Sequence, residues 1–415
     1  MRDVRMKGFA TRVDVEDVER FLVEHTRQCE PEEVDLSQCV GRVLAEEVRA
    51  VVNVPGFPRS AMDGYAIRGE ESFGASSYNP IRFEIIGESM PGQPFEGALA
   101  KGSAVRIMTG APVPVGADAV VMAEVCNEEA GHVEVSEAVA PQRNVGEIGE
   151  DIREGEIVLR AGRRLRAQDA GLLSSIGVGN PRCVRRPRVR LVVTGNELLP
   201  AGSQPGGSKI VDSNSVVLRG LLERDGAELL PFEILPDEPD PIARAMADPL
   251  ADVVLVSGGS SVGKEDFAPR LLDEMGSLDF HGISMRPSSP AGVGRIDERL
   301  VFLLPGNPVS CLCAYEFFAG PSLRAMGGRS RAWPHRRIRL PLARKIASKI
   351  GRTDYVRVGE EGGKIVPLAT SGASILSSTV RAIGAVIIAR ELEGVAPGDE
   401  VEVLLYDDEP WEPSQ

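Results

Sequence analysis

The spacing of apolar residues changes along the chain and predicts regions of different architecture. Val15, Val18 and Leu22 recur at helical spacing, and Asp14 precedes them as a candidate cap, which predicts a helix near the start. From about residue 56 to 149, short apolar stretches such as RFEIIGE and AVRIMTG alternate with glycine and proline. This spacing is typical of a small β domain.

Between 188 and 331, apolar strands alternate with helical patterns. VRLVVTG, DVVLVSGG and RLVFLLPGNP are predicted strands, a helix is predicted over 213–224, and Asn307 and Pro308 suit the cap and first residue of another helix. The alternation predicts a wound parallel α/β sheet. A short helix near 167–175 precedes this region, and YVRV, AVIIAREL and DEVEVLLY after 332 predict a closing β domain.

The composition limits the classes of protein that the chain can belong to. Its 415 residues are enough for about two to four domains, and 42% hydrophobic with 26% charged residues is ordinary for a globular protein. The formal net charge of −14 argues against broad non-specific binding to nucleic acid or to an anionic membrane. We therefore expect no nucleic-acid partner and no membrane partner.

Cysteine and histidine usage excludes two further kinds of site. The six cysteines include no CxxC pair, so neither a zinc site nor a disulfide framework is expected. The four histidines are widely spaced, which disfavours histidine-based metal binding or acid–base catalysis. The longest apolar runs, such as 383–389, are shorter than the roughly 20 residues that span a bilayer, and the first residues hold no signal-peptide core. We expect a cytoplasmic protein.

Polar loops follow the predicted strands of the α/β region. The loops are 194–197, 212–214, 257–266 and 305–310. Ligands of open α/β sheets bind beyond the carboxyl ends of the strands, where backbone amides stabilise phosphate. Glu197, Asp212 and Asp266 are carboxylates that can hold magnesium. Each loop alone also fits a structural role in turns and helix caps, but their convergence on one edge favours phosphate and metal chemistry.

Residues 258–264 also match GxxxxGK, the phosphate-binding loop pattern, between a predicted strand and a predicted helix. Glu265 stands where the pattern needs a Ser or Thr hydroxyl for magnesium, and its carboxylate would repel nucleotide phosphates. A P-loop phosphotransferase is therefore a secondary hypothesis.

The predicted β domain carries a second group of polar motifs. SAMDGYA, RIMTGA and GEDI contain Asp63, Thr109 and Asp151 close to glycines. Aspartate beside glycine commonly forms turns, so the residues alone leave both a structural and a functional role open.

Seven motifs resemble, in order, those of the molybdopterin molybdenumtransferases, the MoeA and gephyrin E-domain family. They are SAMDGYA, RIMTGAPVPVGADAVVMAE, GEDIREG, TGNELL, IVDSN, SGGSSVGKEDF and LPGNPVS. With a compatible C-terminal β region, the resemblance covers nearly the whole chain. It implies an α/β multidomain protein with an elongated helical discontinuous domain (1–55 and 150–187), a β domain (56–149), a central wound α/β molybdopterin-binding domain (188–331) and a C-terminal β domain (332–415).

The resemblance implies a reaction in molybdenum cofactor biosynthesis. Molybdate, a substrate, is inserted into adenylylated molybdopterin, while magnesium-dependent cleavage of the pyrophosphate bond releases AMP. Family members act as homodimers with the site between subunits. A molybdopterin adenylyltransferase and cofactor-accepting enzymes are further candidate partners.

The resemblance also assigns roles to residues, motif by motif. Asp212 and Asp266 are expected to bind Mg²⁺, because a hard cation must offset phosphate charge on an acidic protein. The expected catalytic residues are Asp63, Thr109, Asp151, Glu197 and Arg286, of which Glu197 and Asp63 would position substrate or water. The expected substrate-binding residues are Thr194, Gly258, Gly259, Ser260, Gly263, Pro305, Gly306, Asn307, Ser310, Arg352 and Ser374.

One segment departs from the family pattern. Many members have a KPGKP-like segment where this chain reads RPSSP, from Arg286 to Pro290. Arg286 preserves the charge and can hold an oxyanion with two N–H groups, but it lacks the compact ammonium group of lysine. Ser289 loses the charge, and a simple turn at Ser288 and Ser289 is the structural alternative. The departure bears on how an oxyanion is bound.

Alternatives to the insertase remain open at this point. One is a non-catalytic scaffold or a diverged tungstate-specific paralogue, and the other is the P-loop phosphotransferase. Molybdate and tungstate share charge and shape, so both fit the motifs.

Overall fold

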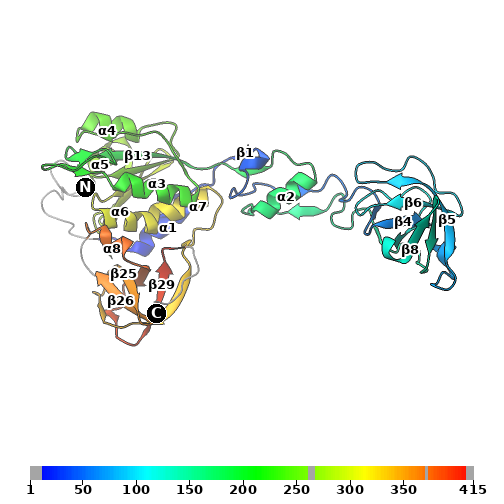
Figure 1. Ribbon diagram of the computed structural model, residues 1–415. Helices are drawn as coiled ribbons and strands as arrows, with labels where there is room; N and C mark the ends of the chain where they lie inside the picture. Colours follow the sequence, from blue (N-terminus) through cyan, green and yellow to red (C-terminus); the bar gives the residue numbers. More distant parts are fainter. Residues whose placement is uncertain (1–11, 260–266, 370–372, 408–415) are drawn as a thin grey trace. The chain divides into compact units, whose positions relative to one another are not determined.

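The computed structural model describes residues 12–259, 267–369 and 373–407, and it divides into two compact units. The first unit comprises Met1–Glu32, Gly41–Val43 and Cys183–Gln415. The second comprises Glu33–Val40 and Leu44–Arg182. Each unit has its own hydrophobic core and is described by itself, with the element labels of Figure 1.

A seven-stranded sheet forms the centre of the first unit, in the order β16-β13-β18-β22-β21-β19, and β17 also pairs with β13. The strands are β13 (Arg188–Thr194), β16 (Glu228–Leu229), β17 (Ile234–Leu235), β18 (Val253–Ser257), β19 (Ser277–His281), β21 (Gly292–Ile296) and β22 (Arg299–Leu304). β16, β17, β13, β18 and β22 are parallel to one another, as the sequence predicted. β21 pairs antiparallel with both β22 and β19, and the link between β21 and β22 is a hairpin too short for a crossover helix.

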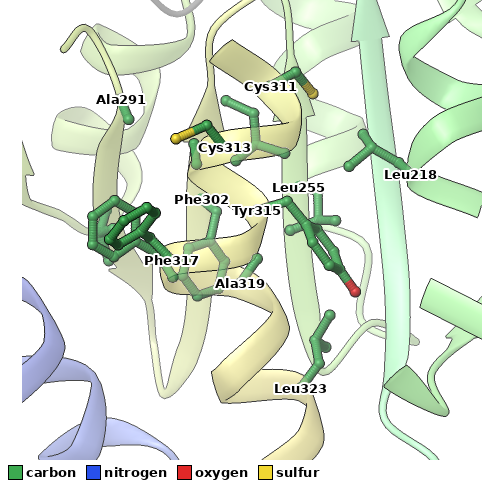
Figure 2. Packing of buried hydrophobic residues seen from close by; sticks show 14 of the residues in the cluster. Leu218, Leu255, Ala291, Phe302, Cys311, Cys313, Tyr315, Phe317, Ala319 and Leu323 are labelled. Atoms are coloured by element: carbon green, nitrogen blue, oxygen red, sulfur yellow. The ribbon is translucent and has the colours of Figure 1, made fainter. Parts of the chain in front are cut away.

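Helices cover both faces of this sheet (Figure 1). They are α1 (Val15–His25), α3 (Asn214–Asp225), α4 (Pro239–Met246), α5 (Ala268–Met275), α6 (Pro308–Ala314), the π-helical turn η4 (Tyr315–Ala319) and α7 (Gly320–Met326). Successive strand residues point to opposite faces. Leu191 therefore packs in the core with α1, α3 and α6, and Val192 packs in the core with α4 and α5. Figure 2 shows the first core, where β18 and β22 meet α6 and η4.

The helix predicted near the start is confirmed as α1, and its contacts place it with the α/β region. Val15, Val18 and Leu22 are buried in the core of the first unit. Asp14 occupies the N-cap position, but its side chain makes no capping hydrogen bond and pairs instead with Arg390. The predicted discontinuous domain of 1–55 and 150–187 stays a prediction, and α1 packs against a different part of the chain from 150–187.

A second sheet, of six strands, closes the first unit in the order β20-β25-β27-β29-β23, with β26 paired to β25. The elements are β20 (Met285–Arg286), β23 (Arg337–Pro341), β24 (Ile346–Ala347), β25 (Thr353–Glu361), β26 (Lys364–Ala369), α8 (Ser377–Val380), β27 (Gly384–Ile388), β28 (Gly394–Val395) and β29 (Glu400–Leu405). Val356, Val386 and Val403 are among its buried residues. β20 comes from the α/β region, so this sheet is built from both parts of the unit.

The second unit contains the predicted β domain, a six-stranded sheet in the order β7-β4-β6-β5-β9-β8. Its strands are β4 (Gly64–Ile67), β5 (Ile81–Ser89), β6 (Ser103–Ile107), β7 (Ala119–Met122), β8 (Cys126–Glu129) and β9 (His132–Val135). β5 and β6 are parallel, and the other pairs are antiparallel. Phe83 and Val133 lie in its core.

Short elements complete the fold. They are β1 (Pro31–Glu33), η1 (Leu36–Gln38), β2 (Val48–Arg49), β3 (Arg59–Ser60), η2 (Gly69–Ser72), η3 (Ala123–Val125), β10 (Val145–Gly146), β11 (Ile157–Leu159), α2 (Ala167–Ser175) and β12 (Arg182–Val184). α2 confirms the helix predicted near 167–175. Of the helices that the structure describes, none is long and apolar enough to cross a bilayer.

Candidate functional site

The carboxyl ends of β13, β18 and β22 open onto a pocket of about 610 Å³, which we call the strand-end pocket. Because these neighbouring strands are parallel, the loops that follow them meet at one edge of the sheet. The sequence-predicted residues that line it are Thr194, Glu197, Asp212, Gly258, Gly259, Pro305, Gly306, Asn307 and Ser374. The predicted residues Ser260, Gly263 and Asp266, and Lys264 of the GxxxxGK pattern, lie outside the described residues.

Gly258 is required by the close approach of two loops in the strand-end pocket. Its backbone has φ +96°, and a Cβ atom there would lie 2.4 Å from the carbonyl oxygen of Thr194. Gly306 of the third loop lies beside Gly258 but less tightly, since a Cβ atom on Gly306 would lie 3.6 Å from the Gly258 Cα, an ordinary van der Waals distance. A larger residue at Gly258 would push the first two loops apart, so this glycine sets the shape of the pocket.

Asn214 ties three of the loops together at the start of α3. Its Nδ2 donates hydrogen bonds to Ser257 Oγ at 3.0 Å and to the Gly306 carbonyl oxygen at 2.8 Å. Its Oδ1 is buried without a hydrogen-bond partner in the part of the chain that the structure describes. This residue lines the pocket, and sequence analysis did not assign it a role.

Asp212 combines a structural and a candidate metal-binding role. Its Oδ1 accepts a hydrogen bond of 3.1 Å from the backbone N–H of Ser215, and the residue lines the strand-end pocket. Over residues 12–259, 267–369 and 373–407, no group of three or more His, Cys, Asp or Glu is arranged to hold a metal ion. Its expected partner Asp266 lies outside those ranges, so the magnesium role of the pair stays a prediction.

Asp237 holds the loop that follows β13. Thr194 Oγ1 donates to Asp237 Oδ1 at 2.7 Å, and the backbone N–H of Asn196 donates to Asp237 Oδ2 at 2.9 Å. Sequence analysis missed this carboxylate. The available signal was its position just after Ile234–Leu235, a strand parallel to β13 whose end lies at the same edge of the sheet.

A second pocket, of about 550 Å³, adjoins the first, and we call it the arginine pocket. Its basic lining residues are Arg12, Arg286, Lys349, Arg352 and Arg357. It shares Pro290, Pro305 and Asn307 with the strand-end pocket. Arg286, Arg352 and Ser310, predicted separately from distant motifs, all line it. One pocket therefore carries several cationic side chains beside another that carries carboxylates.

Asp354 binds two of these arginines from beneath the pocket wall. Its side chain is 0% exposed, and it accepts a hydrogen bond from Arg352 Nε at 2.7 Å. Arg286 Nη2 forms an ion pair with its Oδ2, and Ser348 Oγ donates to the same oxygen at 2.9 Å. Asp354 was also missed, because its partner Arg286 is far away in the sequence.

The RPSSP segment does more than turn the chain. Ser288 is buried with φ +81°, and its hydroxyl donates to the backbone carbonyl oxygen of Ser310 at the start of α6. Ser289 lines the arginine pocket, and its buried Oγ has no hydrogen-bond partner in the described ranges. Ser288 is therefore structural, whereas the hydroxyl of Ser289 is buried beside the arginine pocket without a partner among the described residues.

Three predicted residues belong to the second unit. Asp63 Oδ1 accepts hydrogen bonds from the Thr109 backbone N–H at 2.7 Å and from Thr109 Oγ1 at 2.8 Å. These hydrogen bonds lower the pKa of the exposed Asp63 carboxyl below its ordinary value. Asp151 lies on a separate loop, where its backbone N–H donates to the carbonyl oxygen of Val54 at 3.1 Å. The structure brings Asp63 and Thr109 together, and the catalytic role of all three stays a prediction.

Comparison with family models matches nearly the whole chain. Residues 13–177 match the MoeA N-terminal region (domain I and II), and 190–325 match a probable molybdopterin binding domain. Residues 339–406 match the MoeA C-terminal region (domain IV). Along the chain, the three matches follow the same order as the β domain, the α/β region and the closing β domain.

Curated relatives and solved structures agree with these matches. The chain is 32% identical to the molybdopterin molybdenumtransferase of Haemophilus influenzae, over 90% of this chain and 93% of the relative. It is also 32% identical to that of Bacillus subtilis, over 97% of both chains. The solved molybdopterin biosynthesis MoeA protein of Pyrococcus horikosii is 31% identical with a TM-score of 0.82, covering 97% of this chain and 100% of that chain.

The fold and its two adjoining pockets thus define a multidomain protein built around an α/β domain of the molybdopterin-binding type. The chain belongs to the MoeA family, several of whose curated members are enzymes named molybdopterin molybdenumtransferase.

Proposed function

We propose that this protein is a molybdenum insertase, which transfers molybdenum from molybdate into adenylylated molybdopterin with magnesium-dependent release of AMP. Membership in a family of molybdenumtransferases supports an enzyme of molybdenum cofactor biosynthesis. The observation that carries the proposal is the shared wall between the arginine pocket and the strand-end pocket, at Pro290, Pro305 and Asn307. An oxyanion and a phosphate-bearing pterin can be held side by side there.

The arginine pocket is the proposed molybdate site. Molybdate is a tetrahedral dianion, and guanidinium groups bind such oxyanions through charge-assisted hydrogen bonds. Arg286 and Arg352 line the pocket with Lys349, and the buried hydroxyl of Ser289 adds an uncharged donor. This set of donors supports binding of a small dianion whatever its central metal, so tungstate is a competing substrate.

The strand-end pocket is the proposed site for the adenylylated pterin. The glycines at Gly258, Gly259 and Gly306 let a pyrophosphate approach the backbone closely, where N–H groups stabilise its charge. Thr194, fixed by Asp237, and Ser374 line the same pocket and would orient the substrate.

The carboxylates of the strand-end pocket suit magnesium, which prefers oxygen ligands. Asp212 and Glu197 line the pocket, and the hydrogen bond from Ser215 N–H holds the Asp212 carboxylate in place. With Asp266, these residues would hold the ion. When bound, Mg²⁺ would offset the negative charge of the pyrophosphate whose cleavage releases AMP.

The remaining proposed features concern the second unit and the assembly. Asp63, held by Thr109, and Asp151 would position substrate or water. We propose that the protein acts as a cytoplasmic homodimer, receives its substrate from a molybdopterin adenylyltransferase and passes the product to cofactor-accepting enzymes. Size-exclusion chromatography with light scattering tests the dimer, and a monomer at assay concentration would contradict it.

The test of the reaction is AMP release from adenylylated molybdopterin with magnesium, titrated in parallel with molybdate and with tungstate. Release stimulated by molybdate supports the insertase, and stimulation by tungstate alone identifies a tungstate-specific paralogue. Tight substrate binding without AMP release would identify a scaffold instead. Loss of all nucleotide chemistry in Lys264→Ala, with the fold intact, would favour the P-loop phosphotransferase.

A further inference from the structure

The local fold places Asp354 against both Arg286 and Arg352. β20 and β25 are parallel neighbours, and their register sets Arg286 directly opposite Asp354. Arg352 lies two residues before Asp354. In an extended chain, side chains two residues apart lie on the same face. The carboxylate and the two guanidinium groups therefore meet through strand geometry, although 68 residues separate Arg286 from Asp354.

Only some of the nitrogens of each guanidinium group bind Asp354. Arg352 uses Nε and Nη2 on Asp354, at 2.7 and 3.3 Å. Arg286 uses Nη2, which binds Asp354 and also lies 3.3 Å from the carbonyl oxygen of Ala347. No residue within 12–259, 267–369 or 373–407 accepts from the other N–H groups of these arginines, and both side chains line the arginine pocket, so these groups are left for a ligand there. Asp354 does not line the pocket and does not touch such a ligand.

Electrostatics explain why a carboxylate is needed at this place. Two guanidinium groups that converge on one pocket repel each other, and the repulsion is strong where water is excluded. The buried Asp354 attracts both and fixes their separation. An arginine can bind Asp354 with one nitrogen and an anion with the others, whereas a lysine offers one compact ammonium group for both tasks.

We propose that Asp354 is a positioning residue for oxyanion binding, which holds Arg286 and Arg352 as a fixed pair of donors. The proposal rests on the proposed function, because it takes the arginine pocket to be the molybdate site. It adds a role for Arg286, which stands where many family members have lysine. Arg286 and Arg352 act together as a pair that one buried carboxylate holds in place.

The test is calorimetric titration of the full-length protein with molybdate and with tungstate, without pterin. Asp354→Asn keeps the size of the side chain but removes the charge, and it turns an N–H₂ group toward groups that donate. We expect the dissociation constant for the oxyanion to rise about 10- to 100-fold, the range of a lost charge-assisted interaction. Asp354→Glu, which restores the charge, should recover part of the affinity.

Asp225 offers a matched control in the same unit. It is also a fully buried aspartate bound by two arginines, Arg224 and Arg324, and it lines neither pocket. Asp225→Asn should lower the melting temperature and leave the oxyanion dissociation constant unchanged. In AMP release, Asp354→Asn should raise the KM for molybdate more than it lowers kcat.

The possible failures are distinguishable. If Asp354→Asn binds the oxyanion as the wild type does, the positioning role is overturned and the insertase is untouched. If the wild type binds oxyanion but releases no AMP, the proposed insertase activity is wrong. The binding comparison then still decides the role of Asp354. A wild type that binds no oxyanion overturns the positioning role of Asp354, and AMP release still decides the insertase. If Asp354→Asn does not fold, Ser348→Ala is tested instead, because it removes one hydrogen bond to Asp354. Unchanged oxyanion affinity in Ser348→Ala would overturn the proposal.

Discussion

Thr194 donates a hydrogen bond of 2.7 Å to Asp237, and this contact fixes the end of β13 to the loop that follows β17. The last residue of β13 and a residue of the loop after its parallel neighbour β17 thus hold a loop that lines the strand-end pocket. The same carboxylate also accepts the backbone N–H of Asn196, so one side chain holds both the start and the interior of the loop.

Replacing Asp237 should therefore weaken substrate binding more than folding. Asp237→Ala leaves the Thr194 hydroxyl and the Asn196 N–H without their acceptor, which costs about 1–3 kcal/mol where these groups are not rehydrated. We expect the KM for adenylylated molybdopterin to rise about tenfold. Thr194→Val removes only one of the two hydrogen bonds and should have a smaller effect. Equal KM values in wild type and Asp237→Ala would show that Asp237 does not contribute to substrate binding.

Gly258→Ala should distort the strand-end pocket. The new Cβ would lie 2.4 Å from the Thr194 carbonyl oxygen, at a backbone φ of +96°. Strain of this kind costs on the order of 1–3 kcal/mol, so a lower melting temperature and a large loss of AMP release are expected. Gly202→Ala is the control, because Gly202 also has positive φ but a Cβ there would meet no atom within 4 Å. A melting temperature of Gly258→Ala no lower than that of the control would contradict the clash.

Asp212→Asn separates the structural role of this residue from its proposed metal role. The amide oxygen of asparagine can still accept the Ser215 N–H, so α3 should keep its start and the melting temperature should change little. The lost charge should raise the Mg²⁺ concentration for half-maximal AMP release about tenfold. This is measured by magnesium titration at saturating substrate. An unchanged magnesium requirement would refute the assignment.

The buried Glu316 should make the first unit sensitive to acid. Burial raises the pKa of this carboxyl, but His335, whose Nε2 lies 3.3 Å from Oε1, and the hydrogen bonds from Arg224 outweigh it and bring the pKa to about 2, from an ordinary 4.5. Because the folded-state pKa is below the unfolded one, this stabilisation is present above about pH 5 and is lost as pH falls toward 2. The contribution is on the order of 3 kcal/mol.

Urea unfolding between pH 7 and pH 3 measures this effect. Glu316→Gln should lower stability at pH 7 and flatten its dependence on pH. Glu402→Gln, which removes a solvent-exposed partner of Arg337, should leave the profile unchanged. A wild-type profile in Glu316→Gln would show that another group causes the acid sensitivity.

The parts of the fold that follow local rules could be predicted from the sequence. The apolar run of 253–257 and the helical spacing after Asp14 predicted β18 and α1, because burial on one or both faces of an element determines its pattern. The loops at 194–197 and 305–310 were predicted to converge, since parallel strands end at the same edge. The reversed direction of β21 depends on a short hairpin that the alternation of strands and helices does not reveal.

The carboxylates that organise the site could not be predicted in the same way. Asp237 and Asp354 bind partners 43 and 68 residues away, and the only local signals are the strand that precedes Asp237 and the arginine two residues before Asp354. The resemblance pointed to residues that would contact substrate, such as Arg286 and Arg352. It did not point to the buried groups that hold them, because these act only once distant strands are paired.

The membership of β20 in the C-terminal sheet has a practical consequence for dividing the protein. The sequence suggests a cut near residue 332, between the α/β region and the closing β domain. A fragment beginning there would lack Met285–Arg286, the strand that pairs with Thr353–Asp354, and would expose the edge of β25. It would also leave Asp354 as a buried charge without Arg286. The two regions share one edge strand, so we expect them to need expression together and to unfold together.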